Sequence, residues 1–311
     1  NMKKLTMSSD DSDNANSLHV LFRDTKVPVK HHPSVSKECA KEAIHCSKFQ
    51  RWIKRCEKTV NKKAMKLDEI EIQSVDMFGK KGVGFIKIKA DVSLIKVNGK
   101  QEEQEEEEEP KKIPGIAFLR GDAVGILVAL YCEEDCNMYT VLVEQPRVPV
   151  GTVSCVEMPA GMIDSDTNTV KGIALQELEE ECGIAVEKSD LIDLTKLACE
   201  SAHQKGHIPS LGIMPSPGGC DEMIELYYVE KKVTTVEEIV AMQGRLEGNK
   251  EEGEYIQLHI VPYNDAWKYC GDSKLLSAMF LHQKLREEGT IPPPGTSQAL
   301  PLKKRERRMN G

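Results

Sequence analysis

The sequence predicts an α/β protein, a sandwich of helices on a mixed sheet, with a small helix and β-hairpin domain before it. Three observations support this fold class. Apolar and polar residues alternate in several segments, as they do in strands. Between and after these segments, apolar residues recur every three or four positions, which is typical of helices. A length of 311 residues with 40% hydrophobic content is enough for one or two domains.

Composition divides the chain into five segments. We expect a disordered N-terminus (1–35), a small helix and β domain (36–100), an acidic linker (101–112), a main domain (113–290) and a basic, Pro-containing tail (291–311). The first segment is polar and rich in Ser, Asp and Lys, which is typical of disorder. The run 101–109 is nearly all glutamate, so we expect a solvated linker or hairpin tip, and a docking site for a basic partner is the alternative.

The elements of the small domain follow from its periodicity. Between Ser36 and Val60, apolar residues recur at spacings of three and four, which predicts helix. Residues 66–97 alternate and predict strands, with a break at Phe78 and Gly79.

The elements of the main domain alternate between the two types. We expect strands at 116–119, 123–131, 138–144, 153–158, 191–198, 222–229 and 255–261, and helices at 169–182, 236–244 and 273–288. The first of these helices stops before Gly183, a residue type that commonly ends helices.

Charge and cysteine content limit the functional classes. A net charge of −8 argues against a general nucleic-acid binder, but a bound metal would still allow a small phosphate-bearing ligand. The ten cysteines include no CxxC pair, which favours reduced, mostly buried thiols in an intracellular protein. No apolar run is long enough to span a membrane. We therefore expect a soluble, cytoplasmic protein, with organellar and nuclear locations left open.

Three carboxylates mark the candidate site. Glu177, Glu180 and Glu181 are spaced i, i+3 and i+4, so they share one helical face and repel one another. A divalent cation such as Mg²⁺ would reverse that repulsion, because it takes carboxylate oxygens as ligands and completes its shell with water and phosphate. The alternative is a solvated acidic helix face.

The stretch from Gly161 to Ile184 resembles the Nudix box. Its tail matches the family pattern at Glu177, Leu178, Glu180, Glu181, Gly183 and Ile184. Thr167 stands where the pattern has its first Glu, and Gln176 replaces its Arg; Asp164 or Asp166 is a possible substitute. This resemblance implies a Nudix α/β/α sandwich.

The flanking motifs resemble one branch of that family. Residues 157–161 (EMPAG) and 216–219 (SPGG) are similar to the hydrolases of ADP-ribose and other nucleoside-diphosphate sugars. Segments 75–80, 144–149 and 217–222 look closest to plant-type ADP-sugar diphosphatases. The resemblance implies a homodimer in which the small domain of each subunit reaches across to the other. It also implies Mg²⁺ as cofactor, with Mn²⁺ as a possible substitute.

The same resemblance implies catalytic roles. Glu177 and Glu181 would be direct metal ligands, Glu180 would bind directly or through water, and the Ala160 carbonyl would be a backbone ligand. Glu252 would be the general base on a loop, with Glu254 as a second metal ligand or orienting group. A charged loop without a role is the alternative for that segment.

Substrate contacts are implied at four positions. Arg147 would clamp the diphosphate, since a guanidinium suits two phosphate oxygens, and an exposed strand-end arginine is the alternative. Gly218 and Gly219 would let the backbone approach the ligand. Phe78 would stack on the nucleotide base, whereas core packing is at least as good an account of Phe85. We interpret His203 and His207, in an insertion at 200–211, as surface residues.

The expected function is Mg²⁺-dependent hydrolysis of ADP-ribose or ADP-glucose to AMP and a sugar phosphate. One alternative keeps the chemistry but takes UDP-sugars or capped RNA as substrate. Another is a degenerate Nudix module that binds a nucleotide without turnover, an idea that Thr167 and Gln176 support and the intact glutamates oppose.

Overall fold

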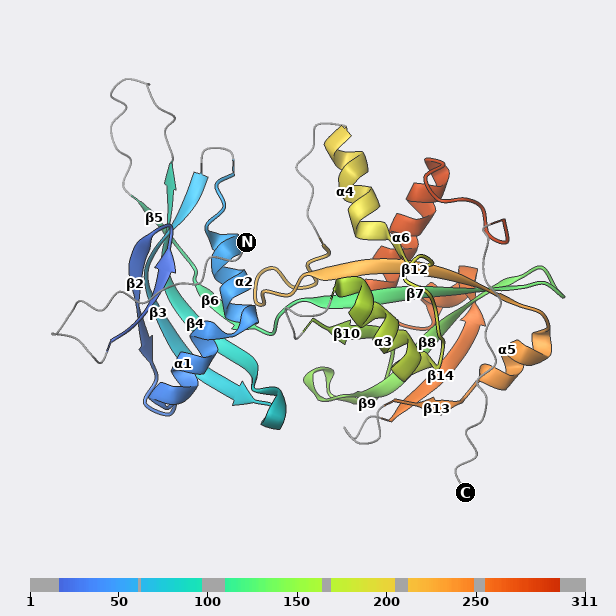
Figure 1. Ribbon diagram of the computed structural model, residues 1–311, viewed down its shortest axis with the longest axis horizontal. Helices are drawn as coiled ribbons and strands as arrows, with labels where there is room; N and C mark the ends of the chain where they lie inside the picture. Colours follow the sequence, from blue (N-terminus) through green and yellow to red (C-terminus); the bar gives the residue numbers. More distant parts are fainter. Residues whose placement is uncertain are drawn as a thin grey trace. The chain divides into compact units, whose positions relative to one another are not determined.

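The computed structural model describes residues 17–60, 63–96, 110–163, 169–204, 212–248 and 255–296. The chain forms two compact units (Figure 1). Unit 1 comprises Asn1–Arg120 and Gly218–Asp221, and unit 2 comprises Gly121–Pro217 and Glu222–Gly311. Each unit has its own sheet and its own hydrophobic core.

Unit 1 contains a six-stranded sheet. Its strands are β1 (Leu18–Phe22), β2 (Thr25–His31), β3 (Lys63–Met77), β4 (Val83–Lys96), β5 (Lys111–Ile113) and β6 (Ile116–Leu119). They run in the order β1-β2-β3-β4-β5, and β6 also pairs with β4. The long β3–β4 hairpin is antiparallel, and its turn falls at Phe78 and Gly79, as predicted.

Two helices, α1 (Lys37–His45) and α2 (Ser47–Cys56), cover this sheet. Ser36 caps α1 by accepting a hydrogen bond from the Cys39 amide, which satisfies one of the free N–H groups at the helix start. The helices bury Ala40, Ala43, Ile44, Phe49 and Ile53 against the isoleucines of β3 and β4. The predicted helical segment is therefore confirmed as a helix pair.

The start of unit 1 differs from the expected disorder. Residues 18–31 form the β1–β2 hairpin, which lies inside the segment expected to be disordered. Val20, Phe22, Val27 and Val29 alternate with exposed residues, among them Leu21 and Pro28, and are buried in the core. The polar composition of the segment concealed this short alternating pattern. Residues 1–16 lie outside the described part of the chain.

The two flanks of the acidic run belong to one sheet. β4 pairs antiparallel with β5, through Val92–Ile113 and Leu94–Lys111 among others. The run therefore connects two neighbouring strands of unit 1, which matches the hairpin alternative, and the expected linker at 101–112 overlaps β5. β6 also belongs to this sheet, so the main domain begins at Gly121, not at residue 113. Residues 101–109 themselves lie outside the described residues.

Unit 2 contains a mixed sheet of eight strands. They are β7 (Ala123–Cys132), β8 (Met138–Arg147), β9 (Thr152–Glu157), β10 (Ala160–Met162), β11 (Ile192–Asp193), β12 (Ile224–Val233), β13 (Leu246–Glu247) and β14 (Ile256–Pro262). The order is β11-β12-β7-β8-β14-β13; β9 pairs with β8, and β10 with β7. β7 and β12 are parallel and the other pairs antiparallel, so the predicted mixed sheet is confirmed.

Helices cover both faces of this sheet (Figure 1). They are α3 (Val170–Cys182), α4 (Leu194–Gln204), α5 (Val236–Met242) and α6 (Ser273–Glu287). Alternate residues of β7 point to opposite faces: Val124 and Ile126 join the core under α3 and α5, and Ala123 and Leu127 join the core under α4 and α6. The unit is therefore the expected α/β/α sandwich.

One predicted strand of unit 2 is wrong. Residues 191–198 were expected as a strand, but only Ile192 and Asp193 pair in β11, and the chain continues as α4. Leu194 and Leu197 pack in the core at helical spacing. The remaining predicted strands and helices of this unit are confirmed to within a few residues.

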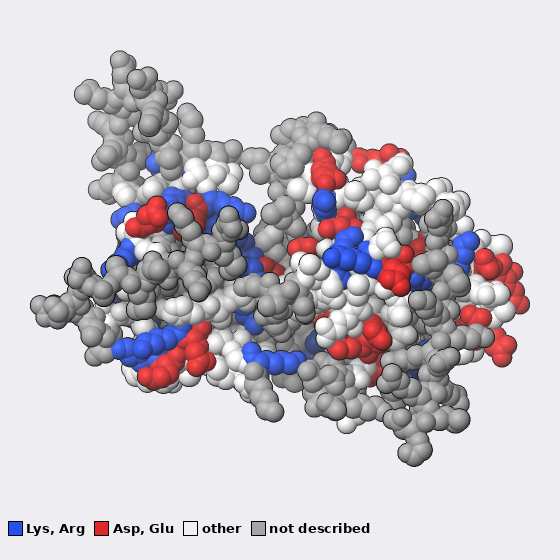
Figure 2. Space-filling model, viewed as in Figure 1, with Lys and Arg blue, Asp and Glu red and all other residues white. Residues whose placement is uncertain are grey.

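The described surface carries small groups of both charges. On the face shown in Figure 2, lysines and arginines are interspersed with aspartates and glutamates. All ten cysteines carry free thiols; four are buried, five are partly buried and one is exposed. None of the described helices is long and apolar enough to cross a bilayer.

Candidate active site

The box helix places the three glutamates in different surroundings. α3 begins at Thr169, whose side chain accepts from the Gly172 amide, and ends at Gly183, which adopts the left-handed conformation at φ 65°. Glu181 is buried at 5% exposure, Glu177 is partly buried, and Glu179 faces solvent as expected. The face is therefore not a fully solvated acidic surface.

Glu177 lies directly over the glycine that opens the box. A Cβ atom built on Gly161 would overlap the carboxyl group of Glu177. Gly161 belongs to the short strand β10, which pairs with β7. Absence of a side chain at this position therefore lets the helix carboxylate approach the backbone of the preceding loop.

Glu180 and Glu181 make separate contacts. The Gln176 side-chain amide donates to Glu180 Oε1 at 3.1 Å, so the residue that replaces the box arginine contacts one of the three carboxylates. The Ala160 amide donates to Glu181 Oε2 at 3.0 Å. Glu181 thus holds Ala160, the residue whose carbonyl is predicted to be a backbone ligand of the metal.

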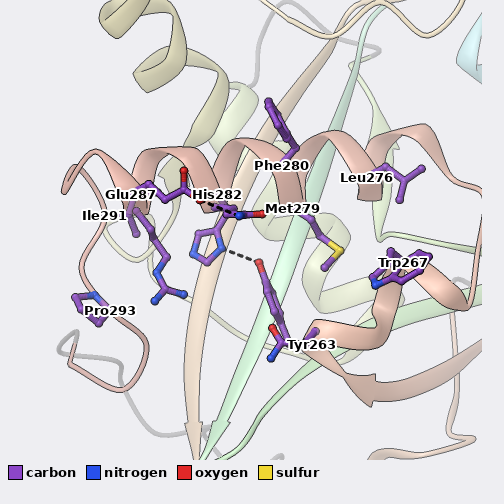
Figure 3. Close-up of a pocket in the computed structure, with 12 residues that line it drawn as sticks. Tyr263, Trp267, Leu276, Met279, Phe280, His282, Glu287, Ile291 and Pro293 are labelled. Carbon is purple, nitrogen blue, oxygen red and sulfur yellow. Dashed lines mark hydrogen bonds between the residues drawn. The ribbon is translucent and has the colours of Figure 1, made fainter.

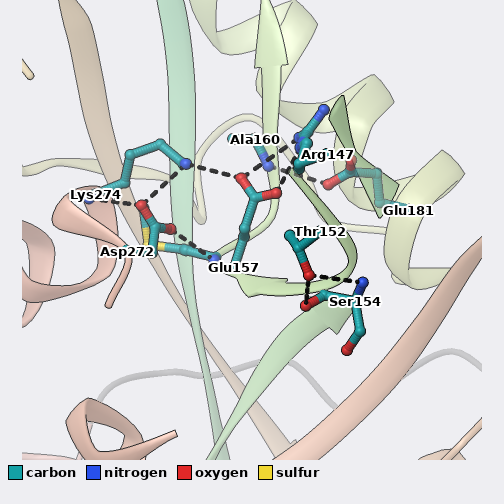
Figure 4. A network of polar contacts seen from close by, with 9 residues as sticks. Arg147, Thr152, Ser154, Glu157, Ala160, Glu181, Asp272 and Lys274 are labelled. Atoms are coloured by element: carbon teal, nitrogen blue, oxygen red, sulfur yellow. Dashed lines mark hydrogen bonds and ion pairs between the residues drawn. The ribbon is translucent and has the colours of Figure 1, made fainter. Parts of the chain in front are cut away.

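The loop from Glu157 to Ala160 is fixed from several sides (Figure 4). The Met158 amide donates to Asp272 Oδ2 at 2.9 Å, and the Pro159 carbonyl accepts from the Ile126 amide at 2.9 Å. Asp272 also caps α6 by accepting from the Lys274 amide. One side chain therefore joins the start of α6 to the loop beside the box helix.

A chain of ion pairs completes this arrangement. Arg147 Nε donates to Glu157 Oε1 at 2.5 Å, and Lys274 Nζ lies 3.2 Å from Glu157 Oε2 and 3.0 Å from Asp272 Oδ1. Figure 4 shows the Glu157 carboxylate between the two cations. We call Arg147, Glu157, Asp272 and Lys274 the loop-anchoring network. Sequence reasoning missed its last two members, although Asp before a predicted helix is a recognisable cap signal.

Interactions within the network favour the charged forms of Glu157 and Arg147. Burial works to raise the pKa of Glu157, but the Arg147 hydrogen bond and the charges of Lys274 and Arg147 outweigh burial and lower it. Burial works to lower the pKa of Arg147, while the hydrogen bond and charge of Glu157 and the charge of Glu181 raise it above its ordinary value. Arg147 therefore lies within the electrostatic reach of the buried box glutamate.

The loop predicted to carry the general base starts next to α3. The Gly248 amide donates to the Glu180 carbonyl at 3.0 Å, immediately before residues 249–254. Glu252 and Glu254 lie outside the described residues, so their roles stay predictions. Glu247, which precedes the loop, pairs with Arg245 and lies 3.0 Å from a Cβ built on Gly183. This fourth carboxylate near the end of α3 was not singled out from the sequence.

The donor set suits a hard cation chemically. All its side-chain donors are carboxylate oxygens, and Mg²⁺ prefers such ligands. Within the described residues, however, no group of three or more His, Cys, Asp or Glu side chains is arranged to hold a metal ion. Glu180 and Glu181 instead engage Gln176 and the Ala160 amide. The residue types fit the cofactor, and metal binding by this set stays a prediction.

Phe78 belongs to unit 1, where it is part of a row of aromatic side chains. Its ring is 41% exposed and lies edge-to-face with Phe85 at a centroid distance of 4.9 Å. Phe85 in turn lies 5.1 Å from Phe118, a partly exposed residue of β6. Sequence reasoning singled out the first two residues and missed Phe118.

The predicted glycine turn also belongs to unit 1. The Gly219 carbonyl accepts from the Phe118 amide at 2.9 Å, so the turn adjoins the aromatic row. Asp221 accepts from the Arg120 amide at 2.8 Å and pairs with Arg55 of α2 at 3.2 Å. Gly218 has open space around it. His207 and the side chain of His203 lie outside the described residues.

Comparison with known proteins identifies the family. No family model matches the chain. The chain is 37% identical over 260 residues to Nudix hydrolase 14, chloroplastic, of Arabidopsis thaliana, covering 83% of this chain and 76% of the relative. Such identity over most of both chains is the level at which membership in a family is shown.

Solved structures give weaker likenesses. The chain matches a MutT/nudix family protein from Enterococcus faecalis at 14% identity with a TM-score of 0.32, covering 52% of this chain and 46% of that one. It matches the NUDIX domain of Shewanella oneidensis NrtR complexed with ADP ribose at 11% identity with a TM-score of 0.37, covering 53% and 86%. Both scores lie below 0.5, so the assignment rests on the plant relative: the chain belongs to the Nudix hydrolase family.

Proposed function

We propose that this protein is a Mg²⁺-dependent ADP-sugar diphosphatase, which hydrolyses ADP-ribose or ADP-glucose to AMP and a sugar phosphate. The observation that carries the proposal is the approach of Glu177 and Glu181 to the loop that contains Gly161 and Ala160. Nudix hydrolases generally use divalent metals such as Mg²⁺. The flanking EMPAG and SPGG motifs support the choice of an ADP-sugar within that family.

The chemistry requires oxygen ligands, a phosphate clamp and a base. Glu177, Glu181 and, directly or through water, Glu180 would hold the cation, with the Ala160 carbonyl as backbone ligand. When bound, the cation neutralises phosphate oxygens and lowers the pKa of water. The buried position of Glu181 favours such a role, because a cation close to a buried carboxylate stabilises its charged form.

Arg147 would orient the diphosphate. The Nε and Nη2 groups of Arg147 donate hydrogen bonds to the Glu157 carboxylate, and the Arg147 side chain remains 40% exposed. A planar guanidinium held on one edge in this way can present its other edge to phosphate oxygens. Glu252, on the loop that starts beside Glu180, would accept the proton of the attacking water, with Glu254 assisting as a ligand or orienting group.

Phe78, Gly218 and Gly219 would contact the nucleotide. The exposed ring of Phe78 offers a stacking surface, and the adjoining Phe118 extends it.

We further propose a homodimer in a cytoplasmic location. Sedimentation of the full chain tests the homodimer. Imaging of a tagged chain in cells tests the location. An organelle is the competing outcome, because the name of the relative describes it as chloroplastic.

The decisive experiment is a substrate panel with a matched pair of variants. ADP-ribose, ADP-glucose, UDP-glucose and capped RNA are assayed with Mg²⁺ and after chelation. We expect the ADP-sugars to be the best substrates and chelation to abolish turnover. Glu177→Gln should lower kcat by about 10³-fold, because it removes a charged ligand. Glu179→Gln, on the exposed side of the same helix, is the control and should keep kcat.

Three results would contradict the proposal. A near-normal kcat in Glu177→Gln would show that this carboxylate is not needed for catalysis. A clear preference for UDP-glucose or capped RNA would move the protein to another substrate class. Tight binding of ADP-ribose without any product would favour a binding module, an outcome consistent with the contact of Gln176 to Glu180.

A further inference from the structure

A cavity lies in unit 2, between α6 and the segments that flank it (Figure 3). Its volume is about 680 Å³, which is large enough for a bicyclic aromatic molecule. Trp267, Met279, Ile291 and Pro293 contribute apolar wall. Trp267 is 57% exposed, a large fraction for an indole ring. None of these residues belongs to the candidate active site.

His282 is the most deeply buried polar residue that lines this cavity. It is only 2% exposed, and its ring stacks on Tyr228 at a centroid distance of 4.1 Å. Its Nδ1 shares a 2.6 Å hydrogen bond with the Tyr263 hydroxyl. The structure gives the hydroxyl no other acceptor among the described residues, so the hydroxyl donates to Nδ1 and the ring proton lies on Nε2.

The protonated nitrogen is left without an acceptor. Nε2 of His282 is buried and has no hydrogen-bond partner among the described residues. Burial, with a smaller effect from the charge of Arg286, lowers the pKa of His282 to about 4, so the ring is neutral at physiological pH. A neutral N–H donor left buried and unpaired costs free energy, and such groups commonly have an unseen partner.

Arg286 supplies a second unsatisfied donor. It follows His282 by one helical turn, so both side chains project from the same side of α6. Arg286 also lines the cavity, and its buried Nε has no partner within the described part of the chain. Glu287, the acidic residue of the lining, accepts from Lys284 and Gln283, so its charge is already compensated. The cavity therefore combines apolar walls with one cation and two unmet donors.

We propose that this cavity is a binding site for a small organic anion, an aromatic or aliphatic carboxylate. Its apolar body would lie against Trp267 and Met279, and its carboxylate would accept from His282 Nε2 and the Arg286 guanidinium. Two donors and a positive charge select an acceptor that carries a negative charge. The site is separate from the proposed hydrolytic centre, and the inference does not depend on that function.

Calorimetric titration of the full chain with 1-naphthoate, and with the neutral isostere 1-naphthamide, tests the site. We expect saturable one-to-one binding of the acid, about tenfold or more tighter than the amide, as a charge-assisted hydrogen bond implies. Arg286→Met should weaken naphthoate binding by about tenfold and leave naphthamide binding unchanged. Lys196→Met, which removes an exposed positive charge of unit 2 outside the cavity lining, should change neither.

A second variant tests the role of His282 Nε2, and a competition experiment tests whether the cavity is separate from the hydrolytic centre. His282→Phe keeps a ring on Tyr228 but removes Nε2, and it should also weaken naphthoate binding; thermal unfolding shows that each variant is folded. ADP-ribose should not compete. Equal affinity for acid and amide, unchanged binding in Arg286→Met, competition by ADP-ribose, or an absence of saturable binding would each overturn the proposal. Loss of binding as the chain self-associates would instead assign the cavity to a second copy and also overturn it.

Discussion

At the scale of single residues, the close approach of α3 to the loop before it depends on the absence of a side chain at Gly161. The Glu177 carboxyl occupies the space that a side chain on residue 161 would fill. Glycine at this position therefore has a steric reason, independent of any turn geometry. The sequence offers no such explanation, because residues 161 and 177 are distant in the chain and only the packed structure brings them together.

Gly161→Ala should consequently displace Glu177. We expect kcat to fall by about 10²-fold, since a ligand shifted by about an ångström loses its productive geometry. Stability should fall by no more than about 1 kcal/mol, because the displaced group is the end of a flexible side chain and not part of a close-packed core. Steady-state kinetics and urea unfolding measure the two effects. Gly271→Ala, where a Cβ meets open space, is the matched control. Normal turnover in Gly161→Ala would show that Glu177 tolerates the shift and weaken its assignment as a ligand.

Other residue-level features of the site were predictable to different degrees. The Gly183 helix end and the exposure of Glu179 follow from local rules of helix geometry, and the structure confirms both. The roles of Asp272 and Lys274 were not predictable, because they depend on contacts with residues more than 110 positions earlier in the chain. Local signals identify a cap, but not what else the capping side chain holds.

At the scale of elements, the loop-anchoring network links α6 to the loop before β10. Lys274 is 16% exposed at its side chain and compensates two carboxylates, and the surrounding charges raise its pKa although burial opposes this. Ion pairs of this kind are sensitive to the loss of one partner, because a buried charge is then left uncompensated. The network therefore positions the loop that carries Ala160.

Lys274→Met should loosen this loop. We expect a loss of about 1–3 kcal/mol in stability, from the undercompensated Glu157 and Asp272. If the loop presents Ala160 to the cation, the Mg²⁺ concentration for half-maximal activity should rise, and Lys274→Arg should partly restore it. Lys268→Met, whose partner Asp265 is exposed, is the control and should change stability by less than about 1 kcal/mol. An unchanged Mg²⁺ requirement in Lys274→Met would limit the network to a structural role.

The segment 191–198, predicted as a strand, shows that hydrophobic periodicity alone does not always distinguish a strand from a helix. Residues 191–198 are rich in leucine and isoleucine, a pattern that suits a buried strand or a buried helix equally well. In the structure Leu191 and Leu194 are buried, and α4 packs its leucines on the sheet. The box helix was easier to predict because Thr169 and Gly183 mark both its ends. Tertiary packing decided the ambiguous segment, and capping residues decided the clear one.

At the scale of the whole molecule, chain order and spatial organisation differ in two places. The strands before residue 121 belong to the first sheet, and Gly218–Asp221 return to that unit from within the second. The bridge between Phe118 and Cys220 and the ion pair between Arg55 and Asp221 fix this return. Composition could not predict either boundary, because both depend on pairing between segments far apart in the sequence. The acidic run looked like a linker between domains for the same reason.

Removal of the acidic run tests this reassignment of the boundary. Because β4 and β5 are neighbours, deletion of residues 101–109 leaves 97–100 (VNGK) and Pro110 to connect them, and Asn98-Gly99 is a favourable hairpin turn. The shorter connection should stabilise unit 1 by about 1 kcal/mol or less. Hydrolase activity should stay within about twofold, as expected for a surface connection. Urea unfolding and steady-state kinetics measure both quantities.

A variant of unchanged length, with every glutamate of the run replaced by glutamine, separates charge from chain length. If the deletion and the glutamine variant both lose activity, the negative charge itself has a function, which favours the alternative of a docking site for a basic partner. If only the deletion unfolds unit 1, the two strands need the longer connection, and the hairpin interpretation is wrong. Retained stability and activity in both variants would establish the run as a tolerated connection between adjacent strands.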